Sequence, residues 1–258
     1  MRFPSPSFPV VSILLSTLTL TVSQVTSNAL SIGIVLFPGF QPLDVIGPLD
    51  IIQLLSGRQN MTLSMIWKET GPVWARSPPR RNPGPVIPGL PAATYPVQAP
   101  SIVATHTFNN APPLDILLVP GGFGNRVLDE NNDTSIEDFV ATRYPELRYL
   151  LSVCTGAASL AKSGVLKGRR ATTNKAAWAW ATQFGENITW VPTARWTVDG
   201  NVWTSSGVSA GIDMTYAFFR KLYGAEVVDT VINVLEYSPH IDEHWDPYAV
   251  VHNVSFWS

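Results

Sequence analysis

The sequence predicts an α/β protein with a mostly parallel central sheet covered by helices on both faces. Short, fully apolar runs, such as residues 32–37 and 114–119, are typical of buried parallel strands. Segments with helical spacing of apolar residues alternate with these runs, as the connections of a parallel sheet require. Hydrophobic residues make up 45% and charged residues 14% of the 258 residues, a balance typical of one soluble core.

The remaining elements follow this alternation. Further strands are predicted over residues 61–67, 102–108, 149–153, 195–198 and 202–205. Helices are predicted over residues 44–55, 134–142, 155–162, 175–184, 211–223 and 226–237. Thr134 is expected to cap its helix, with Glu137 completing a capping box. Asp199-Gly200 predicts a tight hairpin turn.

One domain is expected over residues 30–258, with a proline-rich insertion at about 71–100. Eight prolines and three glycines fall between Gly71 and Val97. Because proline removes a backbone donor and fixes φ, this density excludes a helix or an interior strand. We therefore expect a surface excursion from the compact domain.

Residues 1–29 resemble a secretory signal peptide. Arg2 precedes an apolar stretch over residues 10–22, which is shorter than the roughly 20 residues that a membrane-spanning helix needs, and small residues follow at 27–29. The alternative is an uncleaved anchor. Four Asn-x-Ser/Thr sequons are glycosylation candidates, namely Asn60, Asn132, Asn187 and Asn253. The sequence thus predicts a secreted glycoprotein, or one in the secretory-pathway lumen, without membrane attachment after cleavage. A net charge of −2 gives no argument for nucleic-acid binding.

The single cysteine, Cys154, lies where a predicted strand turns into a helix of small residues. A lone thiol cannot form an intramolecular disulfide. A strand-to-helix turn, or nucleophile elbow, exposes the sulfur at the sheet edge near backbone N–H groups that favour a thiolate. The alternative is a small buried hydrophobic residue.

Two other predicted strand ends carry residues suited to chemistry with this thiol. The first strand leads to Asp44, and the strand over 114–119 leads to Gly121-Gly122. Ligands of open α/β sheets bind beyond the carboxyl ends of the strands. A thiol, a carboxyl group and paired backbone donors there would form a nucleophile, a proton carrier and an oxyanion site. The alternatives are a helix N-cap for Asp44 and a plain turn for the glycines.

Several segments together resemble the ThiJ/PfpI superfamily. They are FPGFQPLDVIGPLD, DILLVPGGFG, SVCTGAASLAKSGVLKGRRATTNKAAW and WTSSGVSAGIDMTYAFF. The resemblance implies a three-layer, flavodoxin-like sandwich of the class I glutamine-amidotransferase type. Within the superfamily, Asp44 in a PLDxxGP context and the Cys154-Thr155-Gly156 elbow resemble the isonitrile hydratase branch. The implied reaction is hydration of an isonitrile to an N-substituted formamide.

The resemblance also implies roles for the site residues. Cys154 would attack the isonitrile carbon, and Asp44 would supply a proton and later help to activate water. The N–H groups of Gly122 and Thr155 would hold the adduct, and the Thr155 hydroxyl would orient Asp44 or the water. This chemistry needs no metal and no organic cofactor. The partner is a small-molecule substrate whose identity stays open, and a homodimer is implied.

One departure separates the chain from other branches of the superfamily. Asn174 stands where protease-like and glyoxalase-like members carry a histidine, which disfavours peptide hydrolysis. Two alternatives stay open: a non-enzymatic redox-sensing or binding protein, and glyoxalase-like handling of 2-oxoaldehydes. His240 and His244 have the spacing of metal ligands, but Pro239 and Pro247 interrupt a helix there, so no metal site is expected.

Overall fold

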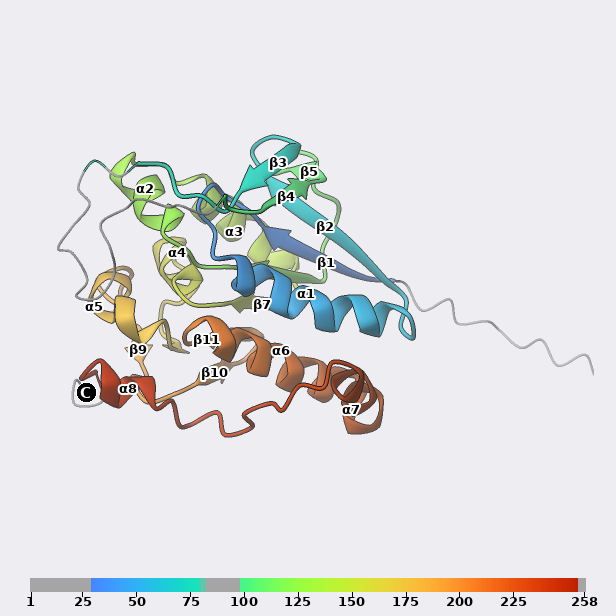
Figure 1. The fold of residues 1–258 in the computed structure, drawn as a ribbon. Coiled ribbons are helices and arrows are strands. Elements are labelled where there is room, and N and C mark those ends of the chain that lie inside the picture. Colours follow the sequence, from blue (N-terminus) through green and yellow to red (C-terminus); the bar gives the residue numbers. More distant parts are fainter. Residues whose placement is uncertain (1–28, 80, 82–97, 255–258) are drawn as a thin grey trace, which may run out of the picture.

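The computed structural model describes residues 29–79, 81 and 98–254 and contains a seven-stranded central sheet (Figure 1). In spatial order the strands are β10 (Trp196–Asp199), β11 (Val202–Ser205), β7 (Tyr149–Ser152), β6 (Ile116–Val119), β1 (Leu30–Val35), β2 (Met61–Trp67) and β5 (His106–Thr107). Every neighbouring pair is parallel except β10 with β11, which form the hairpin predicted from Asp199-Gly200. The mostly parallel sheet is confirmed.

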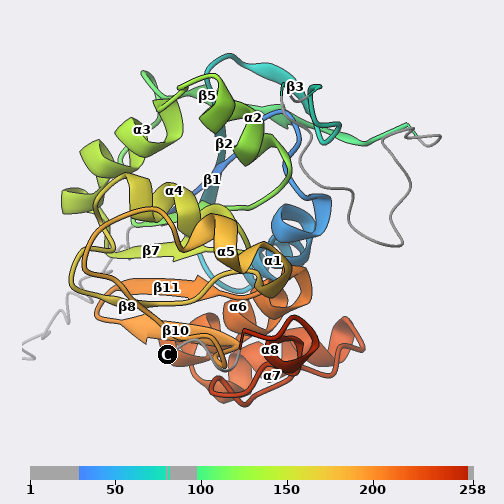
Figure 2. The ribbon, with the colours of Figure 1, turned by 90° about the vertical axis from the view of Figure 1, so that its left-hand side faces the viewer.

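Helices cover both faces of this sheet. On one face α1 (Pro42–Ser56), α6 (Val208–Tyr223) and α7 (Ala225–Val234) pack against one another. On the other face lie α3 (Ser135–Arg143) and α4 (Gly156–Lys162). Figure 2 shows β7 and β11 between α4 on one side and α6 on the other. The apolar strands are buried between the two helical layers, which confirms the predicted three-layer sandwich.

Short elements complete the described chain. They are α2 (Gly124–Glu130), η1 (Tyr144–Glu146), η2 (Lys175–Ala177), α5 (Trp178–Ala181), α8 (Tyr248–Val251) and two small sheets, β3 (Gly71–Trp74) with β4 (Ser101–Ala104) and β8 (Arg170–Ala171) with β9 (Thr189–Trp190). The predicted helix over 175–184 is therefore shorter and begins as a 3-10 turn. The predicted capping box is wrong, because the Thr134 hydroxyl donates to Asp138 and the Glu137 carboxylate lies 3.6 Å from Lys162 Nζ.

The described ends of the proline-rich excursion form an antiparallel ribbon of β3 and β4. Pro72 is tolerated in β3 because this sheet has only two strands, both of them edges. The Gly39 N–H donates to the Trp74 carbonyl at 2.9 Å, which ties the beginning of the excursion to the loop between β1 and α1. Residues 80 and 82–97, within the predicted insertion, lie outside the described residues.

The prediction of a secreted glycoprotein needs correction. Residues 1–28 of the predicted signal lie outside the described residues. Asn132, Asn187 and Asn253 adopt φ values of 53°, 53° and 54°, the left-handed region in which asparagine is enriched. These sequons thus have a conformational explanation and are no evidence of glycans. Among the described helices, none is long and apolar enough to cross a membrane.

Candidate active site

The carboxyl ends of β11, β7, β6 and β1 lie side by side in the sheet and bring the predicted site residues together. The Cys154 N–H, after β7, donates to the Ser206 carbonyl, after β11, at 2.9 Å. The Gln41 N–H, in the loop after β1, donates to the Gly121 carbonyl, after β6, at 2.8 Å. The three strand ends expected from the sequence therefore form one edge.

Cys154 occupies a strained turn between β7 and α4. Its φ of 57° lies in the left-handed region, which costs an L-residue with a Cβ roughly 1–2 kcal/mol. The Gly156 N–H closes the turn on the Val153 carbonyl at 2.9 Å. The side chain is only 7% exposed, so the thiol lies at the bottom of the site. Strain of this kind persists where surrounding contacts enforce it.

Asp44 lies in the first turn of α1 and is fully buried. The Gly121 N–H donates to its Oδ2 at 2.8 Å, whereas its Oδ1 has no hydrogen-bond partner among the described residues. Burial raises the pKa of the Asp44 carboxyl to about 7, although its contacts with Gly121 and with the Cys154 thiol act in the opposite direction. The alternative of an N-cap is wrong, since Gln41 holds that position. Asp44 is therefore a carboxyl group that titrates near neutral pH beside the thiol.

The Cys154 thiol has a raised pKa. Burial is the main cause and the neighbouring Asp44 adds to it, while the N–H and hydroxyl of Thr155 and the Arg126 guanidinium oppose the shift. The expectation of a resting thiolate is therefore wrong. The argument from the helix N-terminus left out burial, which dominates here. The sulfur is a thiol at neutral pH and needs a base when it attacks.

Two of the predicted hydrogen-bonding roles also need correction. The Gly122 N–H donates to Thr155 Oγ1 at 2.9 Å, so it is not free to hold an adduct. The Thr155 hydroxyl donates to Asn125 Oδ1 at 2.9 Å and thus braces the glycine loop instead of orienting Asp44. The Thr155 backbone N–H has no carbonyl acceptor among the described residues and lies beside the sulfur. Of the two expected backbone donors, Gly122 and Thr155, Thr155 is therefore the one whose N–H remains available to hold an adduct.

Gly121 permits the close contact between the β6 loop and the elbow. A Cβ at this position would lie 2.5 Å from both the N and the Oγ1 of Thr155 and 2.9 Å from the Cys154 Cβ. Contacts this short with backbone atoms cannot be relieved by rotating a side chain. A glycine is therefore required for the carboxyl, the donor and the thiol to meet.

The structure adds two site residues, Asn125 and Arg126, that the sequence analysis did not identify. Both lie on α2, a helix that was not predicted. Asn125 is buried and accepts the Thr155 hydroxyl, as described above. The Arg126 guanidinium lies 4.4 Å from the ring centroid of Trp180 and 5.8 Å from that of Phe123. These cation–π contacts hold the Arg126 guanidinium, whose positive charge acts to lower the pKa of Cys154.

A cavity of about 320 Å³ adjoins the elbow. Its lining includes Leu43, Asn174, Lys175, Ser206, Val208 and Tyr248. Leu43 precedes Asp44, and the Ser206 carbonyl accepts the Cys154 N–H, so two residues of the cavity wall are direct neighbours of the site residues. The Asn174 side chain accepts the Ala177 N–H at 3.0 Å and thereby caps a 3-10 turn. It offers no base to the cysteine.

Metal ligation finds no candidate in the described part of the chain. No group of three or more His, Cys, Asp or Glu side chains there has an arrangement that could hold an ion. The backbone N–H of His240 donates to the buried Asp213 at 2.9 Å, and the side chain of His244 is largely exposed.

With this geometry established, similarity to known proteins identifies the family. A family model described as the DJ-1/PfpI family matches residues 30–221. The chain belongs to the DJ-1/PfpI family. This confirms the resemblance to the ThiJ/PfpI superfamily and its isonitrile hydratase-like branch. The matched region contains Asp44, Gly121, Cys154 and Thr155.

Individual relatives agree with this assignment. The chain is 34% identical to an isonitrile hydratase of Pseudomonas putida over 212 residues, which is 82% of this chain and 80% of that protein. It is 26% identical to Drosophila melanogaster DJ-1alpha over 122 residues, covering 47% of this chain and 54% of that one. These matches show no signal peptide, secretion or glycosylation, so the prediction of a secreted glycoprotein is wrong.

Solved structures share the fold. A ThiJ/PfpI family protein from Pseudomonas syringae superposes with a TM-score of 0.65 at 26% identity, covering 82% of this chain and 76% of that one. Drosophila melanogaster DJ-1beta gives a TM-score of 0.60 at 18% identity, covering 81% and 99%. The predicted flavodoxin-like fold is confirmed.

Proposed function

We propose that this protein is a cysteine-dependent enzyme that hydrates an isonitrile to an N-substituted formamide. One observation carries the proposal: a buried carboxyl, Asp44, lies beside the Cys154 thiol and has an oxygen with no hydrogen-bond partner in the part of the chain that the structure describes. The 34% identity to a protein named isonitrile hydratase supports the same reaction. Asn174 leaves the thiol without the imidazole that peptide hydrolysis uses.

The first step adds the thiol across the isonitrile carbon. Because the pKa of the Cys154 thiol is raised above its usual value and that of Asp44 is about 7, the pair above pH 7 consists of a thiol and a carboxylate. The carboxylate takes the thiol proton as the sulfur bonds to the terminal carbon of R–N≡C, and it then delivers that proton to the same carbon. The product is a thioimidate, R–N=CH–S–Cys154. Gly121 holds the other carboxyl oxygen in place during this transfer.

The second step adds water and releases the product. The Asp44 carboxylate takes a proton from water, the hydroxyl bonds to the carbon, and the proton passes to nitrogen. Collapse of this tetrahedral adduct breaks the carbon–sulfur bond, releases R–NH–CHO and returns the hydroxyl proton to sulfur. The Thr155 N–H beside the sulfur is placed to stabilise charge that develops there. The organic group R would occupy the adjoining cavity of about 320 Å³.

The other two candidate functions have less support. A cysteine that is 7% exposed and has a raised pKa is a poor sensor of peroxide, because oxidation follows thiolate character and exposure. Glyoxalase-like chemistry lacks the histidine that Asn174 replaces. A homodimer fits the family, and exposed apolar side chains on the C-terminal segment, including Ile241, Trp245 and Val251, supply a surface for it. Light scattering after size exclusion tests that assembly.

The test is product formation from a panel of alkyl and aryl isonitriles, followed by NMR, with purified wild-type protein and Cys154→Ala. We expect formamide with the wild type and a loss of at least about 1,000-fold in the variant. Methylglyoxal and dilute peroxide serve as parallel arms. Turnover of methylglyoxal to lactate, or selective Cys154 oxidation without isonitrile turnover, would favour the alternatives. Equal rates for Cys154→Ala and the wild type would refute the proposal.

A further inference from the structure

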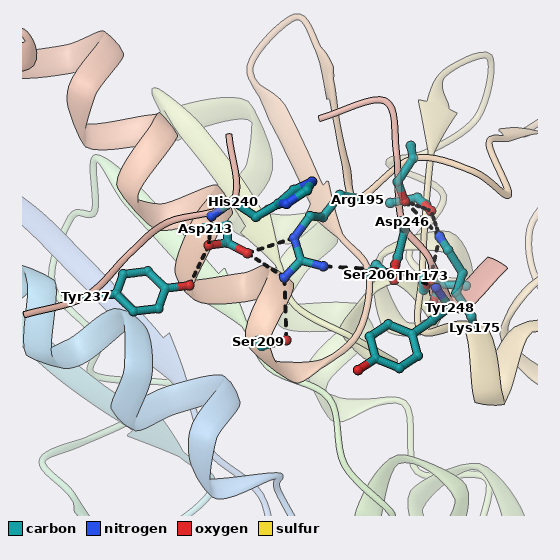
Figure 3. Close-up of polar contacts among 12 residues, drawn as sticks. Thr173, Lys175, Arg195, Ser206, Ser209, Asp213, Tyr237, His240, Asp246 and Tyr248 are labelled. Atoms are coloured by element: carbon teal, nitrogen blue, oxygen red, sulfur yellow. Dashed lines mark hydrogen bonds and ion pairs between the residues drawn. The ribbon is translucent and has the colours of Figure 1, made fainter. Parts of the chain in front are cut away.

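A cluster of buried charges lies at the wall of the cavity beside the elbow, and Lys175, Arg195 and Asp246 all line that cavity. Lys175 is 2% exposed and Asp246 is 1% exposed. Arg195 and Asp213 extend the cluster through an Arg195 Nε–Asp213 Oδ2 contact of 2.7 Å (Figure 3). The proposed reaction uses none of these groups. Buried charges are costly unless they are paired, so a cluster of this size needs an explanation.

The Lys175 Nζ has three hydrogen-bond acceptors, one for each N–H bond of an ammonium group. Its Nζ donates to Thr172 Oγ1 at 2.6 Å, to the Ala194 carbonyl at 2.8 Å and to the Thr173 carbonyl at 3.3 Å. Three acceptors suit the three N–H bonds of an ammonium group, whereas a neutral amine has only two. The Asp246 carboxylate favours the charged form and opposes the effect of burial on the Lys175 pKa. Burial has the larger effect and lowers the pKa of Lys175 to about 7. The three acceptors hold the Lys175 side chain in place and favour its ammonium form.

Asp246 contacts Ser206, the residue that follows β11. The Ser206 hydroxyl donates to Asp246 Oδ2, and the Tyr248 N–H donates to Asp246 Oδ1 at 3.1 Å. Arg195 Nη1 lies 3.9 Å from the same Oδ1. The Ser206 N–H donates to the Arg195 carbonyl at 2.8 Å. Ser206 is thus held through both its side chain and its backbone.

Both chains of contacts end on the backbone of Cys154. The Thr173 hydroxyl donates to the Cys154 carbonyl at 2.9 Å, and the Cys154 N–H donates to the Ser206 carbonyl at 2.9 Å. On one side Lys175 holds Thr173, and on the other side Asp246 holds Ser206. We call Thr173, Lys175, Ser206 and Asp246, which Figure 3 labels, the positioning ring. The Asp246 carboxylate also acts electrostatically on Lys175.

We propose that Lys175 and Asp246 are positioning residues, which act through Thr173 and Ser206 to hold both peptide groups of Cys154 in the left-handed conformation of the elbow. The ring aims the sulfur at Asp44 and at the Thr155 N–H, although neither charge touches the reacting atoms. This inference rests on the proposed function only in treating Cys154 as the reacting group. The 3-10 turn capped by Asn174 sets Lys175 in this place.

The decisive variant is Thr173→Val, which removes one hydroxyl and keeps the side-chain shape. Hydrogen exchange followed by mass spectrometry reports on the Cys154 amide, and β1 and β2 peptides report on global stability. We expect exchange in the peptide containing Cys154 to rise at least tenfold in Thr173→Val, with β1 and β2 unchanged. In Lys175→Met, which also removes a buried charge, exchange at Cys154 should rise by a larger factor than in β1 and β2. Thr173→Ser, which retains the hydroxyl, should stay within twofold of the wild type.

Arg169→Met is the matched control. Arg169 is a partly buried cation that pairs with Asp199 at 3.2 Å, beside the turn between β10 and β11 and thus at the opposite edge of the sheet. It should leave exchange at Cys154 within twofold of the wild type. Exchange at Cys154 that stays unchanged in Thr173→Val, or that rises only together with β1 and β2, would overturn the proposal.

Kinetics separate this inference from the proposed function. In isonitrile hydration, Thr173→Val should lower kcat at least tenfold with KM within twofold, and Thr173→Ser should restore kcat. If the wild type makes no formamide but the exchange pattern holds, the hydratase assignment fails and the positioning ring stands. If KM rises and kcat is unchanged, the ring does not position the nucleophile and the proposal is overturned.

Discussion

Cys154 separates two buried polar regions that differ in how their charges are satisfied. On one side, Asp44 has an oxygen without a partner among residues 29–79, 81 and 98–254, and burial raises its pKa to about 7. On the other side, burial lowers the pKa of Lys175 to about 7 as well, but its Nζ has three acceptors and the Asp246 carboxylate has donors on both oxygens. The difference indicates a division of labour. Unsatisfied groups can exchange protons with a substrate, whereas satisfied groups fix geometry.

Replacing an aspartate by asparagine in each region, at Asp44 and at Asp246, tests this comparison most strongly. Asp44→Asn should lower kcat for isonitrile hydration by about 100- to 1,000-fold, because it removes the proton carrier. At pH 8 it should also raise the free energy of unfolding by about 2–4 kcal/mol, since it removes a buried charge. Asp246→Asn should instead lower that free energy by about 3 kcal/mol, because the Asp246 carboxylate accepts from the Ser206 hydroxyl and the Tyr248 N–H and faces the buried Arg195 guanidinium. Urea denaturation measures both.

The pH dependence follows from the raised pKa of Asp44. Between about pH 4 and pH 7 the folded protein holds a proton on Asp44 that the unfolded chain has lost, so this group makes stability fall as pH rises through that window. The stabilising effect of Asp44→Asn should therefore vanish near pH 4. The wild-type kcat should rise up to tenfold per pH unit below about 7, where Asp44 is protonated and cannot accept the thiol proton. A variant equally stabilised at pH 4 and pH 8 would contradict the assignment of a buried titrating carboxyl.

A pair of glycine substitutions gives a smaller expected effect. Gly121→Ala places a Cβ 2.5 Å from the Thr155 backbone and should cost at least about 2 kcal/mol of stability. Gly207→Ala, on the other side of Cys154, meets only the flexible end of Asn174 at 3.2 Å and should cost under about 1 kcal/mol. Thermal denaturation compares the two. Equal costs would show that the β6 loop can move away from the elbow and that the close contact is not required.

The sequence predicted the first region better than the second. Short apolar runs indicate strands, and parallel strands place their carboxyl ends at one edge of the sheet. The sequence alone therefore predicted that Asp44, Gly121 and Cys154 lie close together. The donors could not be assigned in the same way. Whether the Gly122 N–H is free depends on the side-chain conformation of Thr155, about which residue spacing carries no information.

The second region was not predicted. Lys175 and Asp246 are separated by 71 residues in the chain, and each belongs to a segment whose local pattern has an ordinary explanation, a helix start and a proline-flanked tail. The expectation of a thiolate at Cys154 was wrong for a related reason. A helix N-terminus is a local feature that sequence reveals, whereas the burial that raises the pKa of Cys154 arises from packing of distant segments.

The most direct test of the account is detection of the covalent intermediate. Wild-type protein is mixed with excess isonitrile that carries ¹³C at its terminal carbon, quenched with acid within milliseconds, and analysed by mass spectrometry. We expect a mass increase equal to one isonitrile, located on the tryptic peptide over residues 149–162 and absent from Cys154→Ala. Formamide released by Cys154→Ala at the wild-type rate, with no adduct on the wild type, would contradict attack by Cys154.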